Sequence, residues 1–279
     1  MSFKVIIDSC GELTEELKKD GRFETASLTL QVDDVQIRDD ETFNQKEFLK
    51  LVKESPNCPK SSCPSPESYM QAYDCDAEHV YAVTLSAELS GSYNSAELGK
   101  NLYHEEKGDK QIYVFNSRSA SVGETLIGMK IAELEEAGCT FEEVVEKTEK
   151  YIEEQQTYFV LETLETLRKN GRLSNLKAFV ASALNIKPLM ASTPEGTICQ
   201  LDQARGMQKA LGKMVARIEQ DIKNQENKTL AISHCNCPER AAMVKQQIEK
   251  NCHFKNIFIV DTAGISSMYA NDGGVIVVG

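Results

Sequence analysis

Two clusters of hydroxyl side chains are the residues of this sequence best suited to bind a ligand. The first reads Lys60-Ser61-Ser62-Cys63-Pro64-Ser65-Pro66, and the second reads Ser90-Gly91-Ser92-Tyr93-Asn94-Ser95. We expect a helix to begin at each cluster, where unpaired backbone N–H groups and the positive end of the helix dipole attract an anion. Two such helix starts side by side predict a cradle for one carboxylate or phosphate group.

Local signals support the first helix start. Ser65 followed by Pro66 is typical of an N-cap residue with proline at the first helical position. Ser61 and Ser62 are then expected in the loop that leads into this helix. Pro64 and Pro66 stiffen that loop, which lowers the entropic cost of ordering it around a ligand.

The second cluster follows a predicted strand over residues 80–85, and Ser90 is expected to cap a helix over 91–103. Gly91 allows a ligand to approach the backbone closely, and ligands of α/β proteins lie beyond the carboxyl ends of strands. A simpler interpretation applies to both clusters: the serines only cap helices and bind nothing.

Apolar, β-branched runs alternate with amphipathic stretches along the chain. The predicted strands are 4–8, 25–32, 80–85, 111–116, 158–161, 230–233 and 257–261, with a hairpin formed by 188–190 and 197–201. The predicted helices are 45–54, 91–103, 119–137, 140–154, 163–170, 175–184, 203–225 and 238–251. This alternation predicts an α/β fold with a largely parallel sheet. The length of 279 residues favours two domains, and we place them at 1–155 and 156–279.

Composition excludes several classes of protein. The net charge is −12, which disfavours nucleic-acid binding and anything beyond transient contact with an anionic membrane. Neither a signal peptide nor an apolar run long enough to span a bilayer is evident in the sequence. Nine cysteines in a chain of this length indicate free thiols and a cytoplasmic location. No metal or other cofactor is expected.

Other chemistry is less well supported. The segment His234-Cys235-Asn236-Cys237 resembles half of a metal site, but the later Cys252 and His253 make a poor second half. The sequence lacks a G-x-S-x-G elbow, a Walker loop and a G-x-G-x-x-G segment, which argues against a serine hydrolase and a nucleotide-binding protein. The acidic run around residues 33–41 is interpreted as a solvated loop, with a cation site as the alternative.

Five segments, in the same order along the chain, resemble the DegV family of bacterial fatty-acid-binding proteins. Ser61-Ser62-Cys63-Pro64-Ser65 is similar to the family's T-S-Q-P-S, and residues 89–96 are similar to its L-S-G-T-Y-x-S-A. The opening Ile7-Asp8-Ser9, residues 164–174 and the pair of segments Pro188-Leu189 and Ala204-Arg205-Gly206 also fit the family pattern. A family histidine near the C-terminal glycines is absent here, and Tyr269 is the nearest match.

The resemblance implies a two-domain α/β protein with a smaller C-terminal domain and a tunnel for one long-chain fatty acid between the domains. By position, Ser61 and Ser90 hold the carboxylate, and we add Ser62, Gly91, Ser92 and Tyr269 to the ligand-binding set. The family further implies no catalytic turnover, because an ATP-dependent fatty acid kinase related to dihydroxyacetone kinases phosphorylates the bound acid for phospholipid synthesis. Arg172 and Arg205 are the candidates for docking that kinase.

The leading hypothesis is therefore a fatty-acid-binding subunit that presents a carboxylate to a separate kinase. The alternative is an enzyme acting on a small carboxylated or phosphorylated metabolite at the same serines. A long apolar tunnel favours the first hypothesis, and a short polar pocket favours the second. Leu28, Leu30, Phe43 and Phe179 are candidate tunnel-lining residues.

Overall fold

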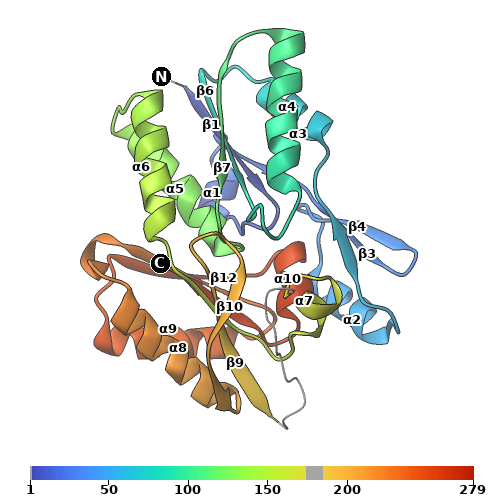
Figure 1. Cartoon of the computed structure of the whole chain (residues 1–279), viewed down its shortest axis with the longest axis vertical. Helices are drawn as coiled ribbons and strands as arrows, with labels where there is room; N and C mark the ends of the chain where they lie inside the picture. Colours follow the sequence, from blue (N-terminus) through green and yellow to red (C-terminus); the bar gives the residue numbers. More distant parts are fainter. Residues whose placement is uncertain (1, 174–184) are drawn as a thin grey trace.

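The computed structural model describes residues 2–173 and 185–279, and two main sheets organise it along its long axis (Figure 1). The first, sheet A, is four-stranded and wholly parallel, in the order β2-β1-β6-β7. Its strands are β1 (Phe3–Asp8), β2 (Phe23–Ala26), β6 (His79–Thr84) and β7 (Gln111–Asn116). This sheet confirms the parallel α/β architecture that the alternation of strands and helices predicts.

Helices cover both faces of sheet A because its strands are apolar on both sides. One face carries α3 (Pro66–Tyr73) and α4 (Ser92–Lys107), and the other carries α5 (Val122–Glu136) and α6 (Phe141–Glu154). The capping box predicted for α6 is present, since Thr140 and Glu143 each bond the other's backbone N–H. The short α1 (Glu15–Lys19) lies between β1 and β2 in sequence.

The second, sheet C, is six-stranded and mixed, in the order β10-β9-β8-β13-β11-β12. Its strands are β8 (Thr157–Val160), β9 (Ile186–Ser192), β10 (Ile198–Arg205), β11 (Thr229–His234), β12 (Asn256–Asp261) and β13 (Val275–Val278). One face packs on α8 (Met207–Asp221) and α9 (Pro238–Asn251). The opposite face packs on α5, α7 (Glu165–Lys169) and α10 (Gly264–Ala270), and it faces the sheet A half of the molecule. A 3-10 turn at Gln225–Asn227 precedes β11.

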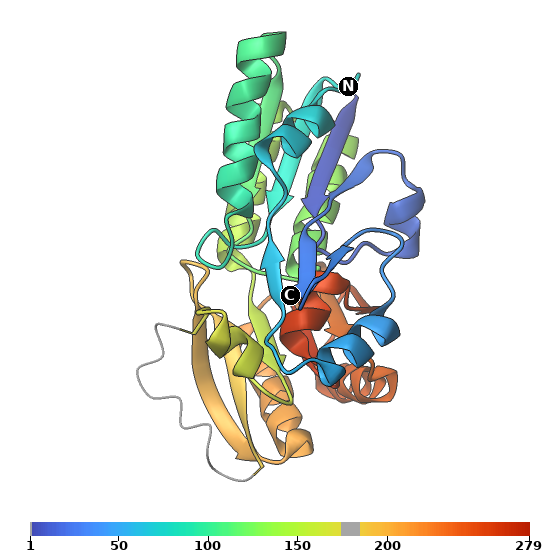
Figure 2. The ribbon, with the colours of Figure 1, turned by 90° about the vertical axis from the view of Figure 1, so that its right-hand side faces the viewer.

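A third, three-stranded sheet B joins the two halves. It contains β3 (Thr29–Val32), β4 (Val35–Arg38) and β5 (Lys60–Ser62), all antiparallel, and α2 (Gln45–Glu54) follows β4. Figure 2 shows the blue α2 beside the red α10. Helix α2, from the N-terminal part of the chain, therefore packs against α10, from the C-terminal end.

Several predicted elements need correction. Residues 25–32 form two strands on different sheets, because the chain leaves sheet A after Ala26 and enters sheet B at Thr29. The predicted helix at 203 begins only at Met207, because β10 continues to Arg205 and Gly206 breaks the strand with a φ of 88°. The helix predicted at 175–184, which includes Phe179, lies outside the described residues. The domain boundary near residue 155 stays a prediction.

Within residues 2–173 and 185–279, no helix combines the length and the apolar character that crossing a membrane requires.

Candidate functional site

A cavity lies between the inner face of sheet C and the loops at the carboxyl ends of the sheet A strands. It contains about 740 Å³ of empty space, including the part that opens to solvent. The residues that line it come from both halves of the molecule: Cys10, Leu85, Leu89, Arg118–Ser121, Thr157, Phe159, Leu161, Leu167, Arg172, Ser192, Gly196–Ile198, Ile265, Ser266, Tyr269, Ala270 and Ile276.

The hydroxyl groups in this wall do not make it polar, because most of them are bonded to other protein groups. Ser119 and Thr157 pair with each other, their oxygens 2.6 Å apart. Ser121 donates to the Glu12 carboxyl at 2.6 Å, and Ser266 donates to a backbone carbonyl at 3.1 Å. The wall therefore presents mainly carbon to the cavity, which suits an apolar ligand.

One end of the cavity carries a charged and a phenolic group. The guanidinium carbon of Arg172 lies 5.9 Å from the centre of the Tyr269 ring, a cation–π distance. Arg172 Nε also donates to the Leu89 carbonyl at 3.1 Å. Burial raises the pKa of the Tyr269 phenol, while the neighbouring Ser61 hydroxyl and the Arg172 charge offset part of that increase. The phenol therefore stays protonated at neutral pH and can donate a hydrogen bond.

Helix α10, which carries Tyr269, is held in place by a buried carboxyl group. Asp39 accepts the N–H groups of Gly264 and Ile265 at 2.7 and 2.8 Å, and the Ser9 hydroxyl at 3.0 Å. Burial raises the pKa of Asp39 to about 6 despite these bonds. The prediction of a solvated acidic loop is wrong for Asp39, since only 2% of this residue is exposed.

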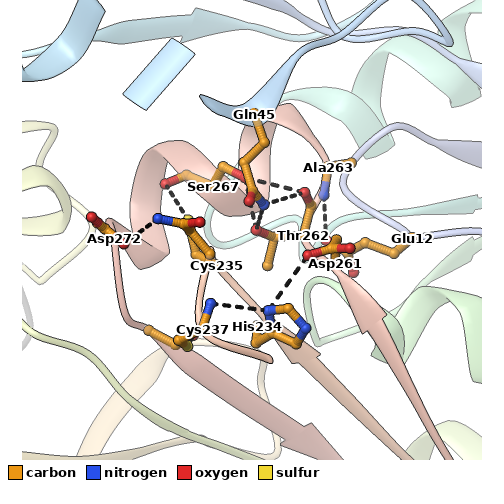
Figure 3. A network of polar contacts seen from close by, with 12 residues as sticks. Glu12, Gln45, His234, Cys235, Cys237, Asp261, Thr262, Ala263, Ser267 and Asp272 are labelled. Atoms are coloured by element: carbon orange, nitrogen blue, oxygen red, sulfur yellow. Dashed lines mark hydrogen bonds and ion pairs between the residues drawn. The ribbon is translucent and has the colours of Figure 1, made fainter. Parts of the chain in front are cut away.

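A polar network secures the loop before α10 and extends to β11 (Figure 3). Gln45 of α2 donates to the Thr262 carbonyl at 3.0 Å and to the Ser267 hydroxyl at 3.2 Å. Glu12 accepts the Ala263 N–H at 3.3 Å. Together with Asp39, Gln45 and Glu12 fix the start of α10 from three separate segments of the N-terminal half. The position of Tyr269 on this helix therefore depends on contacts between the two halves.

Ser61 and Ser62 lie on strand β5, so the expectation of a loop before a helix was wrong for them. Ser61 pairs with Leu30 of β3, and its half-buried side chain reaches Tyr269. Ser62 is exposed, because successive side chains of a strand point to opposite sides. The helix begins later, at Pro66, with Ser65 as its N-cap, as predicted for that pair.

At the second cluster, the N-cap position belongs to Gly91, and α4 begins at Ser92. The Ser90 hydroxyl accepts the Ser92 N–H at 3.2 Å, so Ser90 contributes to the helix start. Ser92 is fully buried, and its hydroxyl donates to Asp8 at 2.6 Å and lies 2.8 Å from the Tyr69 hydroxyl. Because this hydroxyl is occupied in the core, Ser92 is left out of the ligand-binding group proposed below.

The two serine clusters adjoin, as the sequence predicted, through Cys63. A Cβ atom added to Gly91 would lie 3.3 Å from the Cys63 sulfur, and that sulfur lies 3.6 Å from the Ser95 hydroxyl. Neither Ser61 nor Ser90 lines the cavity itself. They flank its Tyr269 end, where Leu89, next to Ser90, is part of the wall.

The two arginines differ in their surroundings. Arg172 is half-buried in the cavity wall, so an exclusive role as a surface docking residue does not fit its position. Arg205 is exposed at the end of β10. Leu28, Leu30 and Phe43 were wrong as tunnel-lining residues, because none of them lines the cavity. They pack beside α10, in a core cluster whose other members include the cavity-lining Cys10 and Ile265.

Sequence reasoning missed a cluster of buried acids behind the cavity wall. Asp8, Glu12 and Glu124 are fully buried, and burial raises the pKa of each, to about 7 for Glu12 and well above the usual value for Glu124. The same burial and the three neighbouring acids raise the pKa of the cavity-lining Cys10 thiol, which therefore stays protonated. A lone glutamate in the apolar first turns of α5 was the available signal in the sequence.

The His-Cys-Asn-Cys segment forms the turn between β11 and α9 (Figure 3). His234 Nδ1 accepts the Cys237 N–H at 3.3 Å and lies 3.5 Å from Asp261, while the Cys237 sulfur faces the Gly274 carbonyl. Burial lowers the pKa of His234. In the part of the chain that the structure describes, no three His, Cys, Asp or Glu side chains gather closely enough to hold a metal ion.

Comparison with known proteins decides the family. A family model described as "Uncharacterised protein, DegV family" matches residues 2–278. This chain belongs to the DegV family. Among curated DegV proteins, a DegV domain-containing protein of Streptococcus pyogenes serotype M1 is 33% identical over 278 residues, covering 99% of this chain and 98% of the relative.

Two solved DegV structures are similar to this chain along its full length. A DegV family protein from Ruminococcus gnavus, refined with vaccenic acid, is 62% identical with a TM-score of 0.98, and the match covers 100% of both chains. The Streptococcus pneumoniae Fatty Acid Kinase (Fak) B3 protein, loaded with linoleic acid, is 31% identical with a TM-score of 0.90, covering 100% of this chain and 99% of that one. The DegV fold is therefore common to all three proteins.

Proposed function

We propose that this DegV protein binds one long-chain fatty acid in the cavity between sheets A and C and presents its carboxylate to a separate ATP-dependent fatty acid kinase. The observation that carries the proposal is a cavity with an apolar wall and one end at which a cation, Arg172, lies over a phenol, Tyr269. The other arginine in the wall, Arg118, lies at the opposite end, 3.8 Å from the Glu149 carboxylate. The vaccenic acid in the R. gnavus relative supports the same ligand class. The apolar wall disfavours the alternative of an enzyme for a small polar metabolite.

Magnitudes indicate which end of the ligand provides affinity. Burying one methylene group contributes about 0.8 kcal/mol, so a tail of roughly 14 methylenes offers on the order of 11 kcal/mol before entropic costs. Hydrogen bonds to the head group add about 1–3 kcal/mol. The tail therefore provides most of the affinity, and the polar end sets which way the acid lies.

The head group is assigned to the Tyr269 end. Ser61 and Ser90 flank this end and supply neutral hydroxyl donors, Gly91 supplies an exposed backbone next to Cys63, and Tyr269 supplies a phenol. Arg172 adds a positive charge beside them, which favours the ionised carboxylate. Ser62 faces away and is assigned no contact with the ligand.

The kinase partner is inferred from the relative named as part of a fatty acid kinase. A binding subunit needs no catalytic group of its own, because it only has to position the carboxylate, whose oxygen attacks a phosphoryl group held by the kinase. The exposed Arg205 is the candidate docking residue on this chain.

The proposal is tested by measuring the rate at which a fatty acid kinase phosphorylates the bound acid. The Ser61→Ala/Ser90→Ala double variant should still fold and bind a fatty acid, since the tail dominates affinity, but a fatty acid kinase with ATP should phosphorylate that acid at least tenfold more slowly. Ser62→Ala/Ser68→Ala is the matched control, because both of these serines are exposed. Equal phosphorylation rates for the two double variants would contradict the assigned head-group site.

A further inference from the structure

The end of the cavity opposite Tyr269 is closed by two buried hydroxyl residues. Thr157, Phe159 and Leu161 line the cavity in succession along and just beyond β8, because alternate residues of a strand share a face. Leu161 belongs to the end near Tyr269 and α7, with which it shares a core cluster. Thr157 lies about 13 Å further along the strand, where its hydroxyl meets Ser119 at 2.6 Å.

A second, more polar cavity of about 490 Å³ lies behind this end. The two cavities share the lining residues Arg118, Ser119, Thr157 and Ser192. These four residues therefore form the boundary between an apolar compartment and a polar one.

The boundary is tightly packed. A Cβ atom added to Gly123 would lie 2.2 Å from the Ser119 hydroxyl and 2.9 Å from its Cβ, so Ser119 packs tightly against α5. Thr157 is fixed by its pairing with Val278 of β13. Ser119 and Thr157 are 4% and 5% exposed, and their mutual hydrogen bond leaves neither hydroxyl in need of a ligand partner.

We propose that the Ser119–Thr157 pair is the stop for the methyl end of the acyl chain and determines the longest chain that the cavity accepts. This inference rests on the function proposed above. A methylene on the Tyr269 side of the pair is removed from water and adds affinity, about fourfold per carbon. A carbon pushed past the pair would enter the polar compartment and would not increase the affinity. The affinity should therefore rise with chain length only until the acyl chain reaches the pair.

The experiment measures dissociation constants for saturated acids from decanoic to eicosanoic acid, with the delipidated full chain. In the parent protein, affinity should rise about fourfold per added carbon and then level off. In Thr157→Ala, the affinity should level off at a chain longer by about two carbons, since the removed hydroxyl and methyl groups leave space for methylenes. Ser192→Leu places a larger side chain in the same boundary, so the affinity of this variant should level off at a shorter chain.

Thr148→Ala is the matched control, because it removes the same atoms from another fully buried threonine that lies on α6 and does not line the cavity. The affinity of this control should level off at the same chain length as that of the parent. If the affinities of the parent, Thr157→Ala and Ser192→Leu all levelled off at one chain length, the Ser119–Thr157 pair would not be the stop. Failure of the parent itself to bind any of the acids would instead contradict the proposed function.

Discussion

The guanidinium of Arg172 lies over the ring of Tyr269, 5.9 Å from its centre, at one end of an apolar cavity. Arg172 follows α7 and Tyr269 is on α10, so the pair joins segments that are far apart in the sequence. Where the DegV resemblance leads us to expect a histidine, this chain has a phenol with an arginine beside it. The positive charge at this end comes from Arg172, since a phenol cannot carry one.

Removing this charge should weaken the binding of a carboxylate more than the binding of a neutral lipid. Arg172→Gln is expected to lower affinity for palmitic acid by about tenfold, as expected for a lost charge-assisted hydrogen bond, and to leave affinity for the methyl ester nearly unchanged. Fluorescence competition measures both constants. Arg205→Gln, at an exposed arginine outside the cavity, is the control. An equal loss for acid and ester would show that Arg172 acts only through packing.

The Tyr269 hydroxyl should contribute to the same discrimination on a smaller scale. Tyr269→Phe keeps the ring under Arg172 and removes one donor, so affinity for the acid should fall by about three- to tenfold, or roughly 1 kcal/mol. Tyr93→Phe, on α4, removes a phenol that does not line the cavity. If both variants bind palmitic acid as tightly as the parent, the phenol makes no hydrogen bond to the carboxylate.

The buried acids predict a specific pH dependence of stability. Burial and the nearby Asp8 charge raise the pKa of Glu124 well above its usual 4.5, and neither of its carboxyl oxygens has a hydrogen-bond partner among the described residues. Above pH 4.5 the unfolded chain loses this proton while the folded chain keeps it. The free energy of unfolding should therefore fall as pH rises, until the pH reaches the folded-state pKa.

Glu124→Gln should flatten this decline, because the amide cannot ionise. Urea unfolding between pH 5 and pH 8 measures the difference in slope, which should correspond to up to one proton. Glu15→Gln, at a fully exposed acid on α1 whose pKa is lowered by Lys18, should not flatten it. A Glu124→Gln protein with the parent's slope would mean that this carboxyl is already ionised in the folded state.

Asp39 should support both the fold and the site through α10. Asp39→Ala leaves the N–H groups of Gly264 and Ile265 buried without their acceptor, which is expected to cost about 2 kcal/mol or more in unfolding free energy. Asp39→Asn keeps one acceptor and should lose less. The neighbouring Asp40, which bonds the exposed Thr42, gives the control Asp40→Ala. A destabilisation no greater than that of Asp40→Ala would show that the start of α10 is held by other groups.

Local patterns predicted the elements whose stabilising contacts are close in sequence. The bounds of α2, β7 and α9 and the capping box at Thr140 agree with the structure, because period, cap residues and apolar face all lie within one segment. The same holds for the Ser65-Pro66 helix start. The family segments then led to the DegV fold, which the comparisons show, while the head-group site near Tyr269 stays a prediction.

Contacts between distant segments could not be predicted in this way. Asp39 looks like any residue of an acidic loop until α10, more than two hundred residues later, places two N–H groups on it. Ser92 looks like a ligand-binding serine until Asp8 and Tyr69 occupy its hydroxyl. Strand β5 was missed because three residues without an apolar pattern become a strand only by pairing with β3.

Native mass spectrometry of the protein purified from bacterial cells tests the central claim most directly. An acyl chain enclosed between the two sheets should survive purification and appear as one non-covalent adduct with the mass of a long-chain fatty acid, which is lost on denaturation. Repeated preparations that give only the mass of the polypeptide, before and after incubation with palmitic acid, would contradict the claim that this cavity holds a fatty acid.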